Sequence, residues 1–167
     1  MKIACVTSLE RGGTDKLLSD IAAQFQSNGV QLAGIVKELD YTSGFENGCD
    51  MKVRVLPKGP VIQITQNLGK GSDACRLDPG AIANAVATVE NGALEGAELF
   101  ILNKFGPEEA AGRGFCNVIA AALDRDIPVL VGVGTASIPA FETFTGGLAN
   151  ALSPQGPAIL AWFQDDV

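Results

Sequence analysis

The chain has 167 residues, of which 47% are hydrophobic, and its mean hydropathy is +0.23, as is typical of one domain with a buried core. Its net charge of −7 argues against nucleic acid or anionic lipid as a partner. Histidine is absent and the four cysteines form no CxxC pair. This composition argues against a zinc or iron–sulfur site and against Ser-His or Cys-His catalysis, so no metal site is predicted.

No apolar run approaches the roughly 20 residues that span a bilayer. The N-terminal apolar segment meets Glu10 and Arg11 too soon for a secretory signal. We therefore expect a soluble, cytoplasmic protein without membrane insertion. In that compartment Cys49 and Cys75 are expected to be free thiols. The other two cysteines, Cys5 and Cys116, lie in apolar segments and are expected to be small buried hydrophobes.

The first half of the chain alternates strand and helix patterns. A strand at Lys2–Thr7 leads through a glycine-containing loop to a helix from Thr14 or Asp15 to about Asn28, and a second strand follows at Val30–Val36. This order is typical of a βαβ unit with a parallel sheet. Period-two alternation then predicts an antiparallel hairpin from Met51–Leu56 and Val61–Thr65, as an insertion or sheet edge.

In the second half, Asp78-Pro79 is a good helix start, with Asp as cap and Pro at the first helical position. That helix is predicted to reach about Leu94. The remaining predictions are buried strands at 99–102, 127–133 and 158–163 and helices at about 115–124 and 140–148. Together they give about five parallel strands, one hairpin and four helices, in one α/β domain over residues 1–167.

The loop between the first strand and the first helix is the first candidate site. Backbone N–H groups at such a place point at an anionic ligand, and the helix dipole favours negative charge. The segment from Thr7 to Lys16 is not a working Walker motif. Ser8 stands where the first glycine belongs, Thr14 takes the lysine position, and Asp15 takes the position of the Mg²⁺-binding hydroxyl.

The second candidate site is the end of the strand Leu99–Leu102. Ligands of open parallel sheets bind beyond the carboxyl ends of the strands, which places Asn103 and Lys104 at the lip of the crevice. The polar, glycine-rich segment from Glu108 to Gly114 follows and is expected to lie outside the core. An ordinary strand-to-helix connection is the alternative interpretation.

Half of the 12 lysines and arginines lie in or beside glycine-rich turns. Their convergence on one crevice predicts an anion site, and a scattered solvated surface is the alternative. The second glycine-rich loop, Leu68–Ser72, forms either an anion-accepting nest beside Arg76 or a plain connection. The candidate phosphate- or oxyanion-binding residues are Ser8, Arg11, Gly12, Gly13, Thr14, Lys16, Gly69, Lys70, Gly71, Ser72, Arg76, Asn103, Lys104 and Arg113.

Several of these segments carry a family resemblance over about Lys2–Leu152. The loop after the first strand, Cys75–Pro79, Asn103–Gly106 and Gly112–Phe115 resemble a bacterial domain of unknown function encoded beside molybdate-transport genes. That domain is grouped with P-loop nucleoside triphosphatases. The resemblance implies a P-loop-NTPase-like three-layer α/β sandwich and a link to molybdenum metabolism. The expected partners are a small anionic ligand and either a second copy of the chain, as a homo-oligomer, or molybdenum-transport or cofactor proteins.

The sequence departs from that of true nucleoside triphosphatases at one strand end, and three hypotheses for the function follow. Where the related enzymes end a strand in Asp-Glu, this chain has Asn103-Lys104, which does not attract a cation. The leading hypothesis is an accessory or regulatory protein that binds a nucleotide (ATP or GTP) or an oxyanion such as molybdate. The second is a Mg²⁺-dependent nucleoside triphosphatase with relocated acids at Asp15, Glu108 or Glu109, and only this one needs magnesium. The third is an interaction module without a ligand.

Overall fold

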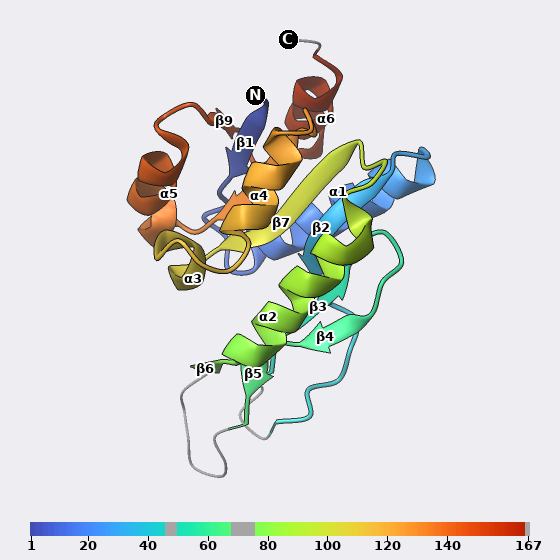
Figure 1. Ribbon diagram of the computed structural model, residues 1–167, viewed down its shortest axis with the longest axis vertical. Helices are drawn as coiled ribbons and strands as arrows, with labels where there is room; N and C mark the ends of the chain where they lie inside the picture. The colour runs from blue at the N-terminus through green and yellow to red at the C-terminus, as the bar shows by residue number, and fades with distance from the viewer. Residues whose placement is uncertain (46–49, 68–75, 166–167) are drawn as a thin grey trace.

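The computed structural model describes residues 1–45, 50–67 and 76–165. Within these ranges a seven-stranded sheet is covered by helices on both faces (Figure 1). The strand order across this sheet is β4-β3-β2-β7-β8-β1-β9. Its strands are β1 (Ile3–Val6), β2 (Leu32–Lys37), β3 (Lys52–Val55), β4 (Val61–Gln63), β7 (Leu99–Phe105), β8 (Val129–Val133) and β9 (Asn150–Leu152).

Two helices pack on one face of the sheet and three on the other. The first pair is α1 (Gly13–Ser27) and α6 (Gly156–Gln164), and the second group is α2 (Pro79–Thr88), α4 (Cys116–Leu123) and α5 (Ile138–Thr145). Figure 1 shows α2 and α4 in front of the sheet and α1 behind it. Three short turns complete the described helices: η1 (Val89–Ala93), α3 (Pro107–Ala110) and η2 (Thr135–Ser137).

The sheet is mostly parallel. β2, β7, β8, β1 and β9 pair in parallel, whereas β3 and β4 extend the sheet from β2 in antiparallel pairs. The predicted hairpin is therefore present, and it lies at one edge. Strands buried on both faces read as continuous apolar runs, and β7 is an example. Its Phe100 and Leu102 pack toward α2 and α4, while Leu99 and Ile101 pack toward α1.

The predicted start of α2 is confirmed. The Asp78 carboxylate accepts hydrogen bonds from the backbone N–H groups of Gly80 at 2.9 Å and Ala81 at 3.1 Å, and Pro79 opens the helix. A capping carboxylate satisfies two amides that the helix itself leaves without partners. After Thr88 the helix widens into η1.

The prediction of a strand at residues 158–163 is wrong, because this segment forms α6. A short apolar run does not distinguish a strand from a buried helix by its periodicity. The missed signal is Gly156-Pro157, since proline is favoured in the first helical turn. In α6, Ile159 is fully buried and Phe163 packs edge-on against Phe25 of α1, with 4.7 Å between ring centroids.

The fifth parallel strand comes instead from β9, which the sequence did not predict. Ala4, Cys5 and Val6 of β1 pair with Asn150, Ala151 and Leu152. A two-stranded sheet formed by β5 (Thr65–Gln66) and β6 (Arg76–Leu77) was also missed, because residues 66–76 read as a loop. The described residues contain two α-helices beyond the four that were predicted, namely α3 and α6.

The two cysteines in the described ranges are free thiols. Cys116 is buried and Cys5 partly buried, and desolvation is the main cause that raises the pKa of each thiol. Cys49 and Cys75 lie outside the described residues. No helix in the described part of the chain is long and apolar enough to cross a membrane.

Candidate functional site

The loop between β1 and α1 closes on itself through short polar side chains. The Ser8 N–H donates to the Thr14 hydroxyl at 2.9 Å, and the Ser8 hydroxyl accepts from the Glu10 N–H at 3.2 Å. Gly12, with φ of +72°, directly precedes α1, and a Cβ at Gly13 would lie 2.3 Å from the Ser8 Oγ. Within the described chain no side chain caps the start of α1, so its first turn offers amide groups and the positive end of the dipole.

A three-residue network joins this loop to the strand ends. The Asp15 carboxylate, in the first turn of α1, accepts from the Lys37 amine at 3.0 Å and from the Asn103 amide nitrogen at 3.0 Å. The Asn103 amide oxygen in turn accepts from the Lys37 backbone N–H at 2.9 Å. The Lys37 and Asp15 side chains are only 26% and 22% exposed. The carboxylate at the Mg²⁺-hydroxyl position is therefore already paired with an ammonium group.

Asn103 and Lys104 lie inside β7, which runs to Phe105 and does not end at Leu102 as predicted. The pairing of β7 with β8 shifts register between Leu102 and Phe105, and such irregularities re-aim side chains near sites. Asn103 is buried against α1, whereas Lys104 is exposed. Two adjacent residues at one strand end therefore have different environments.

Gly132 of β8 allows this part of β7 to approach α1. A Cβ at Gly132 would lie 2.1 Å from the Asn103 carbonyl oxygen and 3.0 Å from Thr14 Cγ2. No real Cβ tolerates the first contact, so only glycine fits between the two elements. This close packing places Asn103 within reach of Asp15.

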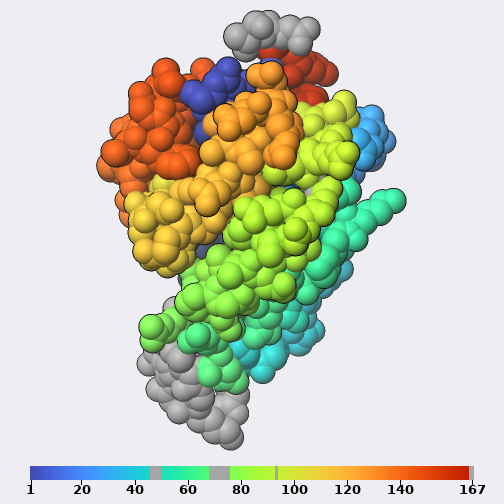
Figure 2. Space-filling view, viewed as in Figure 1, coloured from blue at the N-terminus to red at the C-terminus, as the bar shows by residue number. Residues whose placement is uncertain are grey.

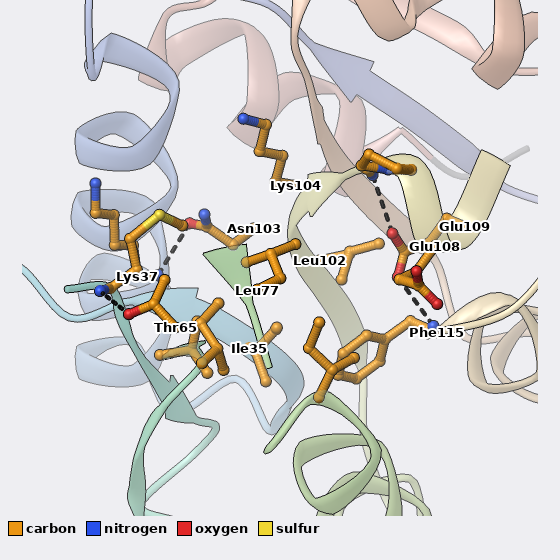
Figure 3. A pocket seen from close by; sticks show the side chains of 16 residues that line it. Ile35, Lys37, Thr65, Leu77, Leu102, Asn103, Lys104, Glu108, Glu109 and Phe115 are labelled. Carbon is orange, nitrogen blue, oxygen red and sulfur yellow. Dashed lines mark hydrogen bonds between the residues drawn. The ribbon is translucent and has the colours of Figure 1, made fainter. Parts of the chain in front are cut away.

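A cavity of about 240 Å³ opens beside the network. Ile35, Leu102 and Leu77 form its apolar floor, and Asn103 and Lys104 lie at its edge (Figure 3). In Figure 3 the Lys104 amine points away from this floor. The Lys104 amine makes no hydrogen bond or ion pair with any of the residues that the structure describes.

The segment 107–114 forms the other side of the cavity mouth. It contains the short helix α3, and Glu109 is buried, contrary to the prediction that this segment lies outside the core. The Glu109 carboxylate accepts from the backbone N–H groups of Gly106 at 3.0 Å and Phe115 at 3.1 Å. Buried carboxylates need such partners, and Glu109 thereby fixes the path of the chain into α4.

Glu108 and Arg113 form a two-point ion pair in the same segment. Arg113 donates from Nε at 2.8 Å and from a terminal nitrogen at 3.1 Å to the two carboxylate oxygens of Glu108. The hydrogen bond from Arg113 is the main cause that lowers the pKa of Glu108, and the same bond raises the pKa of Arg113. Arg113 is therefore held by a carboxylate within its own loop.

The structure brings some of the predicted residues together and separates others. Asn103 meets the start of α1 through Asp15, whereas Arg76 is exposed on β6 and Lys16 pairs with Asp20 on the surface of α1. Arg11 is exposed at the loop tip. Four predicted residues lie outside the described residues: Gly69, Lys70, Gly71 and Ser72.

Lys37 is the site residue that sequence reasoning missed. It lies at the carboxyl end of β2, next to β7 in the sheet, and the carboxyl ends of parallel strands meet at one edge. That rule was applied to the strand at Leu99 and could have been applied to β2 as well. Among the residues that the structure describes, no group of three or more Cys, Asp or Glu side chains could hold a metal ion.

Comparison with known protein families shows to which family this chain belongs. Residues 3–162 match the family described as "Protein of unknown function (DUF2478)". The chain belongs to this family. The resemblance to a domain of unknown function, which the motifs at Asn103 and Gly112 indicated, is confirmed.

One curated relative is the molybdenum import ATP-binding protein ModC 2 of Bradyrhizobium diazoefficiens. It is 34% identical over 165 residues, which are 98% of this chain but 18% of the relative. The chain thus spans less than a fifth of the length of that protein.

Two solved structures share the fold. A human cancer-related nucleoside triphosphatase superposes with a TM-score of 0.67 at 14% identity, covering 98% of each chain. THEP1 from Aquifex aeolicus superposes with a TM-score of 0.65 at 13% identity, covering 99% of this chain and all of that one. The predicted P-loop-NTPase-like α/β fold is confirmed.

Proposed function

We propose that this DUF2478 protein binds a nucleotide or an oxyanion on a degenerate P-loop-NTPase-like fold, in an accessory or regulatory role. The observation that carries the proposal is the contact of Asp15 with Lys37 and Asn103. Phosphoryl transfer relies on Mg²⁺ and a cradle lysine to offset the charge of the phosphates. Here an ammonium group is paired with the carboxylate at the magnesium position, which favours binding of an anion without turnover.

The anion would lie at the first turn of α1, beside Ser8, Gly12, Gly13 and Thr14. The Ser8 and Gly13 N–H groups already donate to the Thr14 hydroxyl and the Glu10 carbonyl, so the amides of Thr14 and Asp15 would be its donors. Helix N-termini bind phosphate through amide groups and the dipole. Lys104 is the foremost charge partner, because its amine has no partner in the described part of the protein. Arg113 would have to leave Glu108 first, and Arg76, Arg11 and Lys16 lie on exposed surfaces.

The proposed setting is molybdenum metabolism. The support is the name of the 34%-identical relative, a molybdenum import ATP-binding protein. Molybdate is one candidate ligand and ATP or GTP is another, and molybdenum-transport or cofactor proteins are candidate partners. A cytoplasmic location is part of the same proposal.

Lys104→Glu tests the assignment of the anion site. Reversing this charge should weaken binding of inorganic phosphate, molybdate and ATP at least tenfold, because repulsion replaces attraction at the same place. Isothermal titration calorimetry measures the affinities, and the thermal midpoint should stay near wild type because Lys104 is exposed.

Lys58→Glu is the matched control, since Lys58 is also exposed but lies in the turn between β3 and β4. Its affinities should stay within about twofold of wild type. Unchanged affinities in Lys104→Glu would refute the site. Absence of any thermal shift with all three ligands, together with capture of a partner protein, would favour the interaction module.

Hydrolysis is the competing function, and we expect none. The candidate relocated acids are all engaged: Asp15 by Lys37, Glu108 by Arg113 and Glu109 by two backbone amides. Purified protein with Mg²⁺ and ATP or GTP should therefore release phosphate at the background rate. Mg²⁺-dependent release that stops in Asp15→Ala would establish the enzyme instead.

A further inference from the structure

The cavity beside the candidate anion site has apolar walls supplied by several parts of the chain. Ile35 comes from β2, Leu102 from β7, Leu77 from β6 and Ile82 from α2, and Phe115 closes the side toward α4. Figure 2 shows the surface recessed where α2 meets the segment 107–114. A mostly apolar pocket with a few polar groups at one end is the usual form of a small-molecule site.

Four charged side chains line this cavity, and two of them, Glu109 and Lys104, form no ion pair with the described residues. Lys37 pairs with Asp15, and Glu108 pairs with Arg113. The Glu109 carboxylate is buried and satisfied by backbone amides. Lys104 alone is an exposed cation without a partner among the described residues, so the mouth offers one positive charge to a ligand.

The size of the cavity limits the ligand. An apolar cavity of about 150 Å³ accommodates one benzene ring. The 240 Å³ cavity therefore accommodates an apolar body of about two fused rings. Figure 3 shows Ile35, Leu77 and Leu102 grouped in the floor, with the Lys104 amine directed away from them. An apolar floor and a separate cationic edge match a molecule with an apolar body and one charged end.

We infer that the ligand of this protein is a small organic phosphate whose apolar body occupies the cavity, and not a free inorganic oxyanion. The inference rests on the proposed function, because the phosphate group would lie between Lys104 and the start of α1. The network of Asp15, Lys37 and Asn103 joins the start of α1 to the cavity, since Asp15 belongs to the first turn of α1 and Lys37 and Asn103 also line the cavity. One molecule can therefore contact both.

The test compares 2-naphthyl phosphate with inorganic phosphate by calorimetry on the full chain. We expect 2-naphthyl phosphate to bind at least tenfold more tightly, because its rings leave water for an apolar cavity. Ile82→Trp, which fills the cavity from the half-buried face of α2, should remove this gain and leave inorganic phosphate unchanged. Ile138→Trp, which lines a different cavity beside Cys5 and Phe141, should retain the gain.

The outcomes separate the two proposals. If inorganic phosphate binds but 2-naphthyl phosphate binds no more than threefold tighter, the cavity inference is wrong and the proposed function stands. If 2-naphthyl phosphate binds through the cavity while inorganic phosphate does not bind at millimolar concentration, the cavity stands and the anion site is wrong. If neither ligand binds, both proposals are wrong. If folded Ile82→Trp still binds 2-naphthyl phosphate more tightly than inorganic phosphate, the cavity inference is wrong.

A second measurement on the wild-type chain avoids any failure of the variant to fold. Intermolecular nuclear Overhauser effects should join the naphthyl protons to the methyl groups of Ile35, Leu77 and Ile82. Effects to the methyl groups of Ile138 and Leu152, in the other cavity, or to none of these methyl groups, would overturn the inference.

Discussion

At the scale of single residues, Asn103 and Lys104 have separate roles although they are neighbours. Asn103 is buried and links Asp15 to the backbone of Lys37, whereas Lys104 is exposed at the cavity mouth. The sequence predicts an amide and an ammonium group at this strand end. The sequence did not predict their division, because the strand was expected to end at Leu102, whereas β7 continues to Phe105 and successive side chains of a strand point to opposite faces.

The pair Asp15–Lys37 should contribute measurably to stability. Because both side chains are about three-quarters buried, a double-mutant cycle with Asp15→Asn and Lys37→Met should give a coupling of about 1 kcal/mol in the free energy of unfolding. Urea denaturation measures it. The exposed pair Lys16–Asp20 on α1 is the control and should give a coupling of about 0.5 kcal/mol or less. Equal couplings would contradict the special role of the first pair.

At the scale of elements, the close packing of β2 against β7 depends on glycine. Gly34 has φ of +105° and pairs with Ile101, and a Cβ there would lie 2.0 Å from the Ile101 carbonyl oxygen. Both the backbone conformation and the space exclude a side chain. Since β2 carries Lys37 and β7 carries Asn103, this contact also sets the spacing of the candidate site.

Gly34→Ala should therefore destabilise the protein by about 3 kcal/mol or more, because either β2 or β7 must shift. Gly92→Ala is the control, since Gly92 lies in η1 without positive φ and with open space around it. Its free energy of unfolding should stay within about 1 kcal/mol of wild type. Thermal denaturation followed by circular dichroism compares the two, and a similar midpoint for both variants would contradict the packing argument.

At the scale of the whole molecule, two helices from distant parts of the sequence, α1 and α6, form one layer of the sandwich. α6 packs with α1 on the same face of the sheet, and the end of α6 lies near the start of β1 (Figure 1). The Lys2 amine donates to the Phe163 carbonyl at 3.1 Å and lies 5.4 Å from the centre of the Trp162 ring. Segments more than 150 residues apart thus form one part of the core.

A substitution at Ile159 tests how much the packing of α6 contributes to stability. Replacing the fully buried side chain with alanine should cost about 2–4 kcal/mol, from lost transfer free energy and the remaining cavity. Leu148→Ala removes a side chain that is 66% exposed and should change stability by less than about 0.5 kcal/mol. Urea denaturation monitored by the fluorescence of Trp162 measures both variants. A small effect of Ile159→Ala would mean that α6 is peripheral to the core.

The sequence by itself determined the fold class, most of the elements and the chemistry of the strand end. Buried parallel strands read as apolar runs, Asp78-Pro79 marks a helix start, and period-two alternation marks the hairpin, because these signals are local. Local signals did not determine which segment forms the fifth parallel strand. Residues 158–163 suit a strand as well as a helix, and only the space beside β1 and the surface of α1 assign β9 to the sheet and α6 to the layer.

Only the tertiary structure decided which residues form the candidate site. Asp15, Lys37 and Asn103 are far apart in the sequence, and they meet because parallel strands place their carboxyl ends at one edge and Gly132 lets β7 approach α1. The same packing buried Glu109, paired Glu108 with Arg113 and left Lys104 without a partner in the described residues. Pairing of charges depends on three-dimensional distance, which residue types and spacing do not encode.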